Sequence, residues 1–212
     1  MKKAYTQEKV QSIREDIMKA AEKLYKKYGY EYVNLLRISA YTHLSRPSIY
    51  NYYHSKEEIF LDILLREYSA MGEDLKKALT KDRRSCDELA EQLGEVILKH
   101  LYLLKLVSSY ENSIETNSTI AHLADYRKGW EETFYQKFME GLSYQFEDIS
   151  EVEKDNFINL FVASLYGIYP LICPSEERVS ALKAAGRYRE IDRHQFVTKT
   201  MQLLLTNLCK AA

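Results

Sequence analysis

The chain has 212 residues, of which 46% are hydrophobic and 29% are charged, and its formal net charge at pH 7 is −1. This composition is typical of a folded globular protein and excludes an intrinsically disordered chain. Its 7 glycines and 3 prolines are too few for the many tight turns of an all-β fold, so the sequence predicts long helices.

The charge is unevenly distributed along the chain. Residues 1–56 contain 11 Lys/Arg and 5 Asp/Glu, a net charge of +6, whereas the remaining residues contain 19 basic and 26 acidic side chains, a net charge of −7. A basic N-terminal quarter favours a local contact with a polyanion. Chance clustering of solvated side chains would also produce this pattern.

The cysteines and the apolar segments indicate where the protein resides. Cys86, Cys173 and Cys209 are far apart and form no CxxC pair, so we expect three buried thiols in a reducing cytosol rather than a zinc site or a disulfide framework. The N-terminus carries no apolar signal segment, and no stretch approaches the ~18 apolar residues of a membrane span. We therefore expect a cytoplasmic protein without membrane contact, metal or cofactor.

The first helix is predicted between Val10 and Tyr28, where apolar residues recur every three or four positions and Gly29 follows as a stop. Asn34 is placed to cap a short second helix. That helix would carry Leu35, Leu36, Ile38 and Ser39.

Two further serines are placed to cap the next helices. After a tight turn around His43, Ser45 would cap a third helix, with Pro47 in its first turn, where a missing amide proton costs little. Ser55 would cap a fourth helix that runs towards Leu79, in a sequence that fits a capping box.

The rest of the chain is also predicted to be helical, with polar breaks. Loops are expected at 80–85 and 111–118, and Pro170 and Pro174 are expected to end the helix before them. No segment alternates with period two, and the predicted fold class is all-α. The further helices are expected at 87–110, 125–146, 151–169, 176–185 and 191–208.

Three short helices within about 50 residues, the second and third joined by a short turn, predict a helix-turn-helix. The third helix would enter the major groove of DNA while the second braces it across the backbone. Polar tips suited to this task are supplied by Arg46, Ser48, Tyr50, Asn51 and Tyr52.

The run from Leu44 to Glu57, preceded by Ile38-Ser39, resembles the TetR family of transcriptional regulators, and the resemblance covers about residues 8–65. His43 stands where that family prefers glycine, so we expect a strained turn there. The resemblance implies phosphate contacts by Asn34, Ser48, Tyr50 and Lys56, and contacts with base edges or neighbouring phosphates by Arg46, Pro47, Asn51 and Tyr52. The expected DNA-binding residues are thus Asn34, Ser45, Arg46, Pro47, Ser48, Tyr50, Asn51, Tyr52 and Lys56.

The resemblance also implies a division into a DNA-binding domain at 1–55 and a helical effector-binding and dimerisation domain at 56–212. The predicted homodimer interface lies on the helices at 151–169 and 191–208, although the same apolar residues could form an intramolecular core. Its candidates are Leu160, Ser164, Gly167, Phe196, Met201, Leu204, Leu205 and Leu208.

A pocket for a small effector would need apolar walls with a few polar groups. Each candidate residue could equally belong to the core. The candidate walls are Tyr102, Tyr110, His122, Tyr126, Trp130, Phe134, Tyr166 and Tyr169.

The predicted function is that of a homodimeric repressor, released from a palindromic double-stranded DNA operator by a small apolar or aromatic ligand. The alternative is a DNA-bound protein without such an effector, which recruits a protein partner through its acidic helical body. No catalytic frame is recognisable, with neither a Gly-rich phosphate loop nor a GxSxG motif, so an enzyme is not expected.

Overall fold

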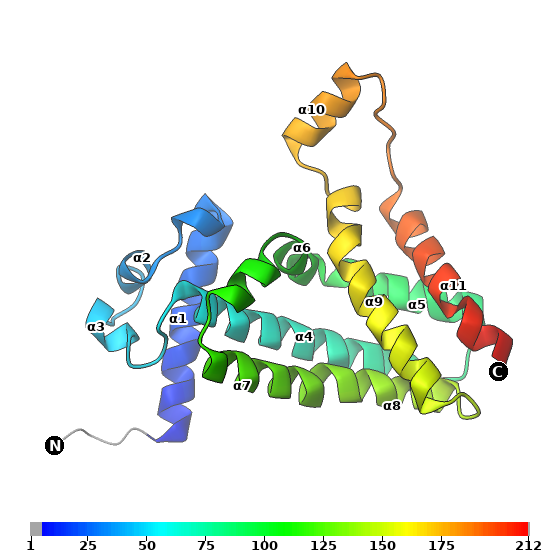
Figure 1. The fold of residues 1–212 in the computed structure, drawn as a ribbon, viewed down its shortest axis with the longest axis horizontal. Coiled ribbons are helices and arrows are strands. Elements are labelled where there is room, and N and C mark those ends of the chain that lie inside the picture. Colours follow the sequence, from blue (N-terminus) through cyan, green and yellow to red (C-terminus); the bar gives the residue numbers. More distant parts are fainter. Residues whose placement is uncertain (1–5, 212) are drawn as a thin grey trace. The chain divides into compact units, whose positions relative to one another are not determined.

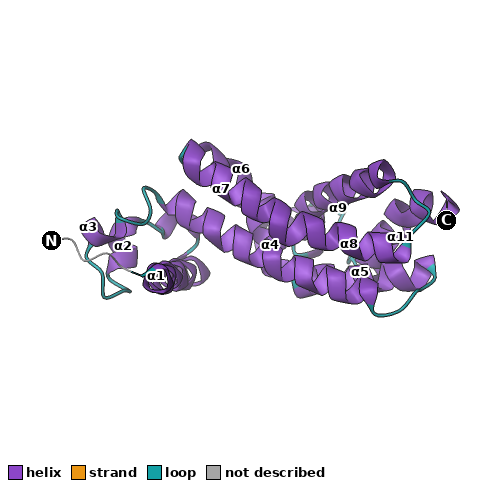
Figure 2. Cartoon of the chain, turned by 90° about the horizontal axis from the view of Figure 1, so that it is seen from below, coloured by secondary structure: helices purple, strands orange, loops and turns teal. Residues whose placement is uncertain are grey.

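The computed structural model describes residues 6–211, and these form helices and loops with no strand (Figures 1 and 2). The all-α prediction is therefore confirmed. The chain divides into two compact units. The first contains the residues up to Leu65 together with Asn112–Arg127, and the second contains Arg66–Glu111 and Lys128–Ala212. The predicted boundary between 55 and 56 stays a prediction.

The first unit is built on a long helix and three short ones. Gly29 ends the first helix with a φ of +84°, a backbone angle that glycine adopts without steric cost. Its elements are α1 (Gln7–Tyr28), the 3-10 turn η1 (Tyr30–Tyr32), α2 (Leu35–Ser39), α3 (Arg46–Ile49), the start of α4 (Lys56–Thr80), the end of α6 (Leu101–Thr116) and most of α7 (Ile120–Trp130).

The predicted caps and the core of this unit are present. The Asn34 side chain accepts a hydrogen bond from the backbone N–H of Arg37, and the Ser45 hydroxyl accepts one from the N–H of Ser48. The Ser55 hydroxyl accepts one from the N–H of Glu58, whereas the Glu58 carboxylate accepts from the N–H of His54, one residue before the position that the predicted capping box requires. These bonds fix the starts of α2, α3 and α4 around a core of fully buried side chains, among them Ile17, Ala21, Ile38, Ile49 and Tyr53.

The turn at His43 differs from its prediction. No non-glycine residue of the described chain has a positive φ. His43 therefore does not take the strained left-handed conformation that was expected where the family prefers glycine. The turn is instead held by the Thr42 hydroxyl, which accepts a hydrogen bond from the backbone N–H of Leu44 at 3.3 Å. A short polar side chain can close a turn in this way without a glycine.

The second unit has an aromatic core. The ring of Tyr68 lies edge-to-face against those of Trp130 and Phe134, and the ring of Phe134 against that of Phe138, at centroid distances of 5.1–6.1 Å. Such edge-to-face contacts stabilise beyond the area that they bury. Gly72 lets α4 approach this region, because a Cβ there would lie 2.5 Å from the carbonyl oxygen of Thr133. The other elements are α5 (Cys86–Lys99), the π-helical turn η2 (Glu131–Tyr135), α8 (Gln136–Gln145), α9 (Glu151–Ile172), α10 (Glu176–Ala184) and α11 (Arg193–Ala211).

Two predicted helix boundaries are wrong. The segment predicted at 87–110 breaks at His100, whose ring nitrogen Nε2 lies 2.8 Å from the Asp74 carboxylate. The stretch predicted as a polar loop at 111–118 is helical as far as Thr116. Its polar side chains bond to the helix's own carbonyls, for example Thr116 Oγ1 to Asn112 O at 2.8 Å, so they do not interrupt it.

Pro170 does not end α9, which continues to Ile172. A proline removes the hydrogen bond to the carbonyl four residues earlier, here that of Tyr166. Pro170 lies in the last turn of α9, where one fewer hydrogen bond within the helix does not prevent it from continuing to Ile172.

The cysteines also differ from their prediction, because Cys86 and Cys209 form a disulfide whose Cα atoms are 6.2 Å apart. Cys86 opens α5 and Cys209 lies near the end of α11, two helices that pack closely together. Only this packing brings residues 123 positions apart within bonding distance. Cys173 is free and partly exposed.

Reduction of this disulfide is expected to lower the free energy of unfolding by about 2–5 kcal/mol, because the bond closes a long loop in the unfolded chain. Guanidinium denaturation with and without dithiothreitol measures the difference, and a Cys86→Ser/Cys209→Ser variant should be insensitive to the reductant. Three reactive thiols in the untreated, denatured protein, instead of one, would contradict the assignment.

Candidate nucleic-acid interface

Part of the predicted DNA-binding set lines one surface groove of the first unit. Residues from the start of α2, from α3 and from the start of α4 line it. Four of the nine predicted residues lie on its wall, although they are up to 22 positions apart in the sequence. The full lining is Asn34, Leu35, Leu36, Arg46, Tyr50, His54, Ser55, Lys56 and Glu57.

Arg46 and Tyr50 form a pair on the outer face of α3. The Arg46 guanidinium donates a hydrogen bond to the Tyr50 hydroxyl at 3.1 Å and lies 5.7 Å from the ring centroid. Both side chains are exposed, Tyr50 to 42%. The hydroxyl thus aligns the guanidinium, and a positioned guanidinium can bind guanine or a phosphate with two parallel hydrogen bonds.

Lys56 sits at the start of α4 and is partly exposed. Its ammonium group donates a hydrogen bond to the carbonyl of Tyr30 at 3.1 Å and lies 4.0 Å from the Tyr30 ring centroid. An ammonium group has three donors, so this contact fixes the charge beside the groove and leaves donors for a phosphate. Glu57 and Glu58 in the first turn of α4 offset the positive end of that helix, so the positive charge offered at this position is that of Lys56.

The remaining predicted residues lie on or beside α3. Pro47 and Asn51 are exposed, while Ser48 and Tyr52 are partly exposed. The Ser45 and Ser48 hydroxyls are 2.8 Å apart, so part of their hydrogen-bonding capacity serves the helix cap.

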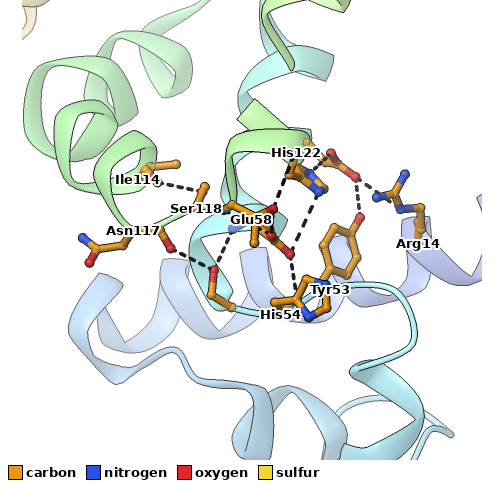
Figure 3. Close-up of polar contacts among 11 residues, drawn as sticks. Arg14, Tyr53, His54, Glu58, Ile114, Asn117, Ser118 and His122 are labelled. Atoms are coloured by element: carbon orange, nitrogen blue, oxygen red, sulfur yellow. Dashed lines mark hydrogen bonds and ion pairs between the residues drawn. The ribbon is translucent and has the colours of Figure 1, made fainter. Parts of the chain in front are cut away.

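His54 of the groove wall also belongs to a polar cluster, which we call the α4 cluster, formed by Glu58 and Asp62 of α4 with Tyr53, His54 and His122 (Figure 3). The Tyr53 hydroxyl donates to Asp62 at 2.6 Å, and His122 Nε2 lies 2.8 Å from the other oxygen of that carboxylate. Arg14 of α1 also approaches Asp62, at 3.6 Å. The cluster joins α1, the residues after α3, the start of α4 and the start of α7.

Glu58 is the buried centre of the α4 cluster, with 1% of its surface exposed. It accepts hydrogen bonds from the backbone N–H of His54 at 2.6 Å and from the Thr119 hydroxyl and N–H. Burial by itself raises the pKa of a carboxyl, but the hydrogen bonds from Thr119 and His54 outweigh it, so the pKa of Glu58 is lowered. Glu58 is thus a satisfied buried anion that stabilises the fold in its charged form.

Glu58, Asp62 and Leu36 were not predicted from the sequence to be functional residues. Glu58 and Asp62 have the ordinary i,i+4 spacing of a solvated helix face, and their partners Thr119 and His122 are about 60 positions away. Leu36 was assigned to a helix as an apolar residue, yet it is 61% exposed and lines the groove. Adjacent apolar residues are ordinary in an amphipathic helix, as the buried pair Ala20 and Ala21 shows, so no signal in the sequence identifies Leu36 as exposed.

The candidate pocket residues fall into both units, so they remain a prediction. His122 and Tyr126 belong to the first unit, where His122 is engaged by Asp62. In the second unit, Trp130 and Phe134 stack in the aromatic core and Tyr166 is exposed. Tyr169 lines a surface depression together with residues of the loop after α10, and Tyr102 and Tyr110 are partly buried.

The candidate interface residues divide by exposure. Met201, Leu205 and Leu208 are buried within the second unit, where α11 packs against α5 and α9, so these three side chains add little to an external surface. Leu160 is 52% exposed and Gly167 is also exposed. Ser164, Phe196 and Leu204 are partly exposed.

Two further observations concern other kinds of site. No single helix of the described chain is long and apolar enough to cross a membrane, although the bent pair α9 and α10 passes that test by length and composition. Within residues 6–211, no group of three or more His, Cys, Asp or Glu side chains could hold a metal ion.

A short capped helix beside a bracing helix is the arrangement of a helix-turn-helix. Residues 17–63 match the family model of bacterial regulatory proteins of the tetR family, and residues 65–208 match the tetracyclin repressor-like C-terminal domain. The chain belongs to the TetR family of transcriptional regulators, which confirms the resemblance found in the sequence. Its N-terminal helix-turn-helix is a DNA-binding domain.

Solved structures share this fold. A TetR/AcrR-family regulator from Thermobifida fusca is 18% identical, with a TM-score of 0.56 over 92% of this chain and 97% of that one. The TetR family repressor AlkX from Dietzia sp. is 12% identical, with a TM-score of 0.57 over 93% and 96%. The fatty acid degradation regulator FadR from Bacillus halodurans is 17% identical, with a TM-score of 0.50 over 91% and 94%. No curated protein sequence matches the chain.

Proposed function

We propose that this regulator is a homodimeric repressor that binds a palindromic operator through the groove between α2, α3 and α4, and that a small apolar or aromatic ligand releases it. The single observation that carries the DNA-binding part is the convergence of Asn34, Arg46, Tyr50 and Lys56 on that groove. Gel shifts with the DNA upstream of the protein's own gene test it. Specific retardation in the presence of excess non-specific competitor is expected.

Dimerisation is supported by apolar surface on α9 and α11. A groove there is lined by Phe157, Leu160, Leu204 and Leu208, with Glu153 and Asn156 at its polar side. Leu203 on α11 is 66% exposed. Exposed apolar surface rimmed by polar side chains is typical of an interaction site, and a two-fold dimer would present two recognition helices to successive major grooves.

A Leu160→Asp/Leu203→Asp variant is therefore expected to be monomeric, because each dimer would bury four uncompensated carboxylates. Size-exclusion chromatography with light scattering measures the mass. Ile120→Asp is the matched control, since Ile120 is 87% exposed in the first unit. A double variant that keeps the mass of two chains would place the interface elsewhere.

Release by an effector would act through the α4 cluster. His122 and Thr119 at the start of α7 are bonded to Asp62 and Glu58, and Glu58 also holds the backbone of His54 after α3. A ligand that favours another position of α7 would therefore disturb the end of the recognition element. Thermal-shift screening with aliphatic and aromatic compounds, followed by release from DNA in gel shifts, tests this step.

The second candidate is a regulator without a small effector, whose body recruits a protein. It is favoured by the 26 acidic against 19 basic residues beyond residue 56, which suits a basic partner. Crosslinking of the DNA-bound protein in cell extract separates the two candidates. The control is a variant in which the exposed carboxylates beyond residue 56 are replaced by amides, and a partner that crosslinks to the native chain but not to this variant would favour the second candidate.

A further inference from the structure

Leu36 is an exposed apolar side chain in a polar surface. It is 61% exposed, whereas Leu35 and Ile38 on the same short helix are buried at 7% and 0%. The core of the unit therefore does not account for it. The need to form helix α2 does not account for Leu36 either, because exposed positions of a surface helix such as this five-residue one are normally polar.

Its surroundings restrict what could cover it. Leu36 lines the groove that also contains the hydrogen-bonding side chains of Asn34 and Tyr50. The groove also holds two cations, Arg46 and Lys56, against one carboxylate, Glu57, so its net charge is positive. The surface around Leu36 thus suits DNA rather than another apolar protein face. Leu35 also lines the groove but is buried, so Leu36 is the exposed apolar side chain on it.

We propose that Leu36 contacts the C5-methyl group of a thymine and so sets a sequence preference at that base pair. The edges of all four base pairs in the major groove carry hydrogen-bonding atoms, and the thymine methyl is the one apolar group among them. A leucine side chain has neither donor nor acceptor. It would leave a polar base edge without a partner but can exclude water from a methyl group. This inference rests on the proposed DNA-binding function.

Thymine and uracil differ only in this methyl group, so the pair gives a direct test. Full-length protein first selects its preferred duplex from a random pool, and each thymine of that duplex is then replaced singly by deoxyuridine. For the native chain, one position per half-site is expected to lose about three- to tenfold in affinity, the effect of burying one methyl-sized group.

The Leu36→Ala variant should bind the thymine and deoxyuridine duplexes equally at that position, and Leu36→Met should retain part of the discrimination. Ile120→Ala, which removes an exposed apolar side chain outside the groove, should discriminate like the native chain. Circular dichroism melting checks that the variants fold.

The outcomes separate this inference from the proposed function. Two results would overturn the role of Leu36 and leave DNA binding intact. The first is a selected duplex for which no deoxyuridine substitution weakens binding. The second is a Leu36→Ala variant that still binds the thymine duplex more tightly than the deoxyuridine duplex, by the same factor as the native chain. If the Leu36→Ala substitution changes the mass of the oligomer in solution, Leu36 contacts a second copy of the chain, and the proposed thymine contact is overturned as well. Failure to enrich any duplex refutes the proposed function and this inference with it.

Discussion

Replacing Arg46, Tyr50 and Lys56 together by alanine is expected to weaken binding to the selected duplex about a thousandfold. Each side chain lines the groove, and one contact of this kind contributes roughly 1–3 kcal/mol, where 1.4 kcal/mol corresponds to about tenfold in affinity. Arg46 and Tyr50 are bonded to each other, so their separate effects should not add.

Affinities measured by fluorescence anisotropy at several salt concentrations give a second readout. Loss of phosphate contacts should reduce the dependence of affinity on salt by about one unit of slope for each contact. The matched control is Lys81→Ala/Arg187→Ala/Tyr188→Ala, which removes the same residue types and charge from exposed positions of the second unit. Native affinity in the groove variant would show that DNA is bound by another surface.

Replacing Glu58 by alanine is expected to destabilise the first unit by about 2–4 kcal/mol. The substitution removes the acceptor of the His54 N–H and of both Thr119 donors. A hydrogen bond to a charged group contributes about 1.5–3 kcal/mol, and water can replace part of this loss because His54 and Thr119 are exposed residues. Hydrogen exchange at residues 54–60 and 117–122 measures the local loss, and thermal melting measures the global one.

The Glu58 effect should depend on pH in a defined direction. Because the pKa of Glu58 is lowered in the folded state, its stabilisation is complete above the ordinary carboxyl value of 4.5 and is lost as the pH falls below it. The difference in stability between the native chain and Glu58→Gln should therefore shrink in acid. Glu31→Ala, which removes an exposed carboxylate in the same unit, should change little, and an equal effect there would contradict the argument.

Local sequence determined much of the DNA-binding element. The caps at Asn34, Ser45 and Ser55 each bond within three residues, so composition and spacing alone specify them. The same holds for Pro47 in the first turn of α3 and for Gly29 after α1. Consequently the helix order, the exposed face of α3 and the family were all predictable from the sequence.

The contacts between residues distant in the sequence are seen only in the tertiary structure. Thr119 and His122 reach α4 from about 60 positions away, and Cys86 meets Cys209 across 123. Such pairs depend on how helices pack, which a periodic pattern does not encode. For the same reason the sequence could not show that Met201 and Leu205 are buried within one chain while Leu203 is exposed.

Helix caps and amphipathic faces depend on residues only a few positions apart, so the helical class and the recognition element could be predicted from the sequence alone. The tertiary structure decided that Asn34, Arg46, Tyr50 and Lys56 share one groove, that Leu36 is exposed in it, and that Glu58 is buried in the α4 cluster. Burial and convergence of side chains are properties of packed helices. They arise only when segments distant in the sequence are brought together.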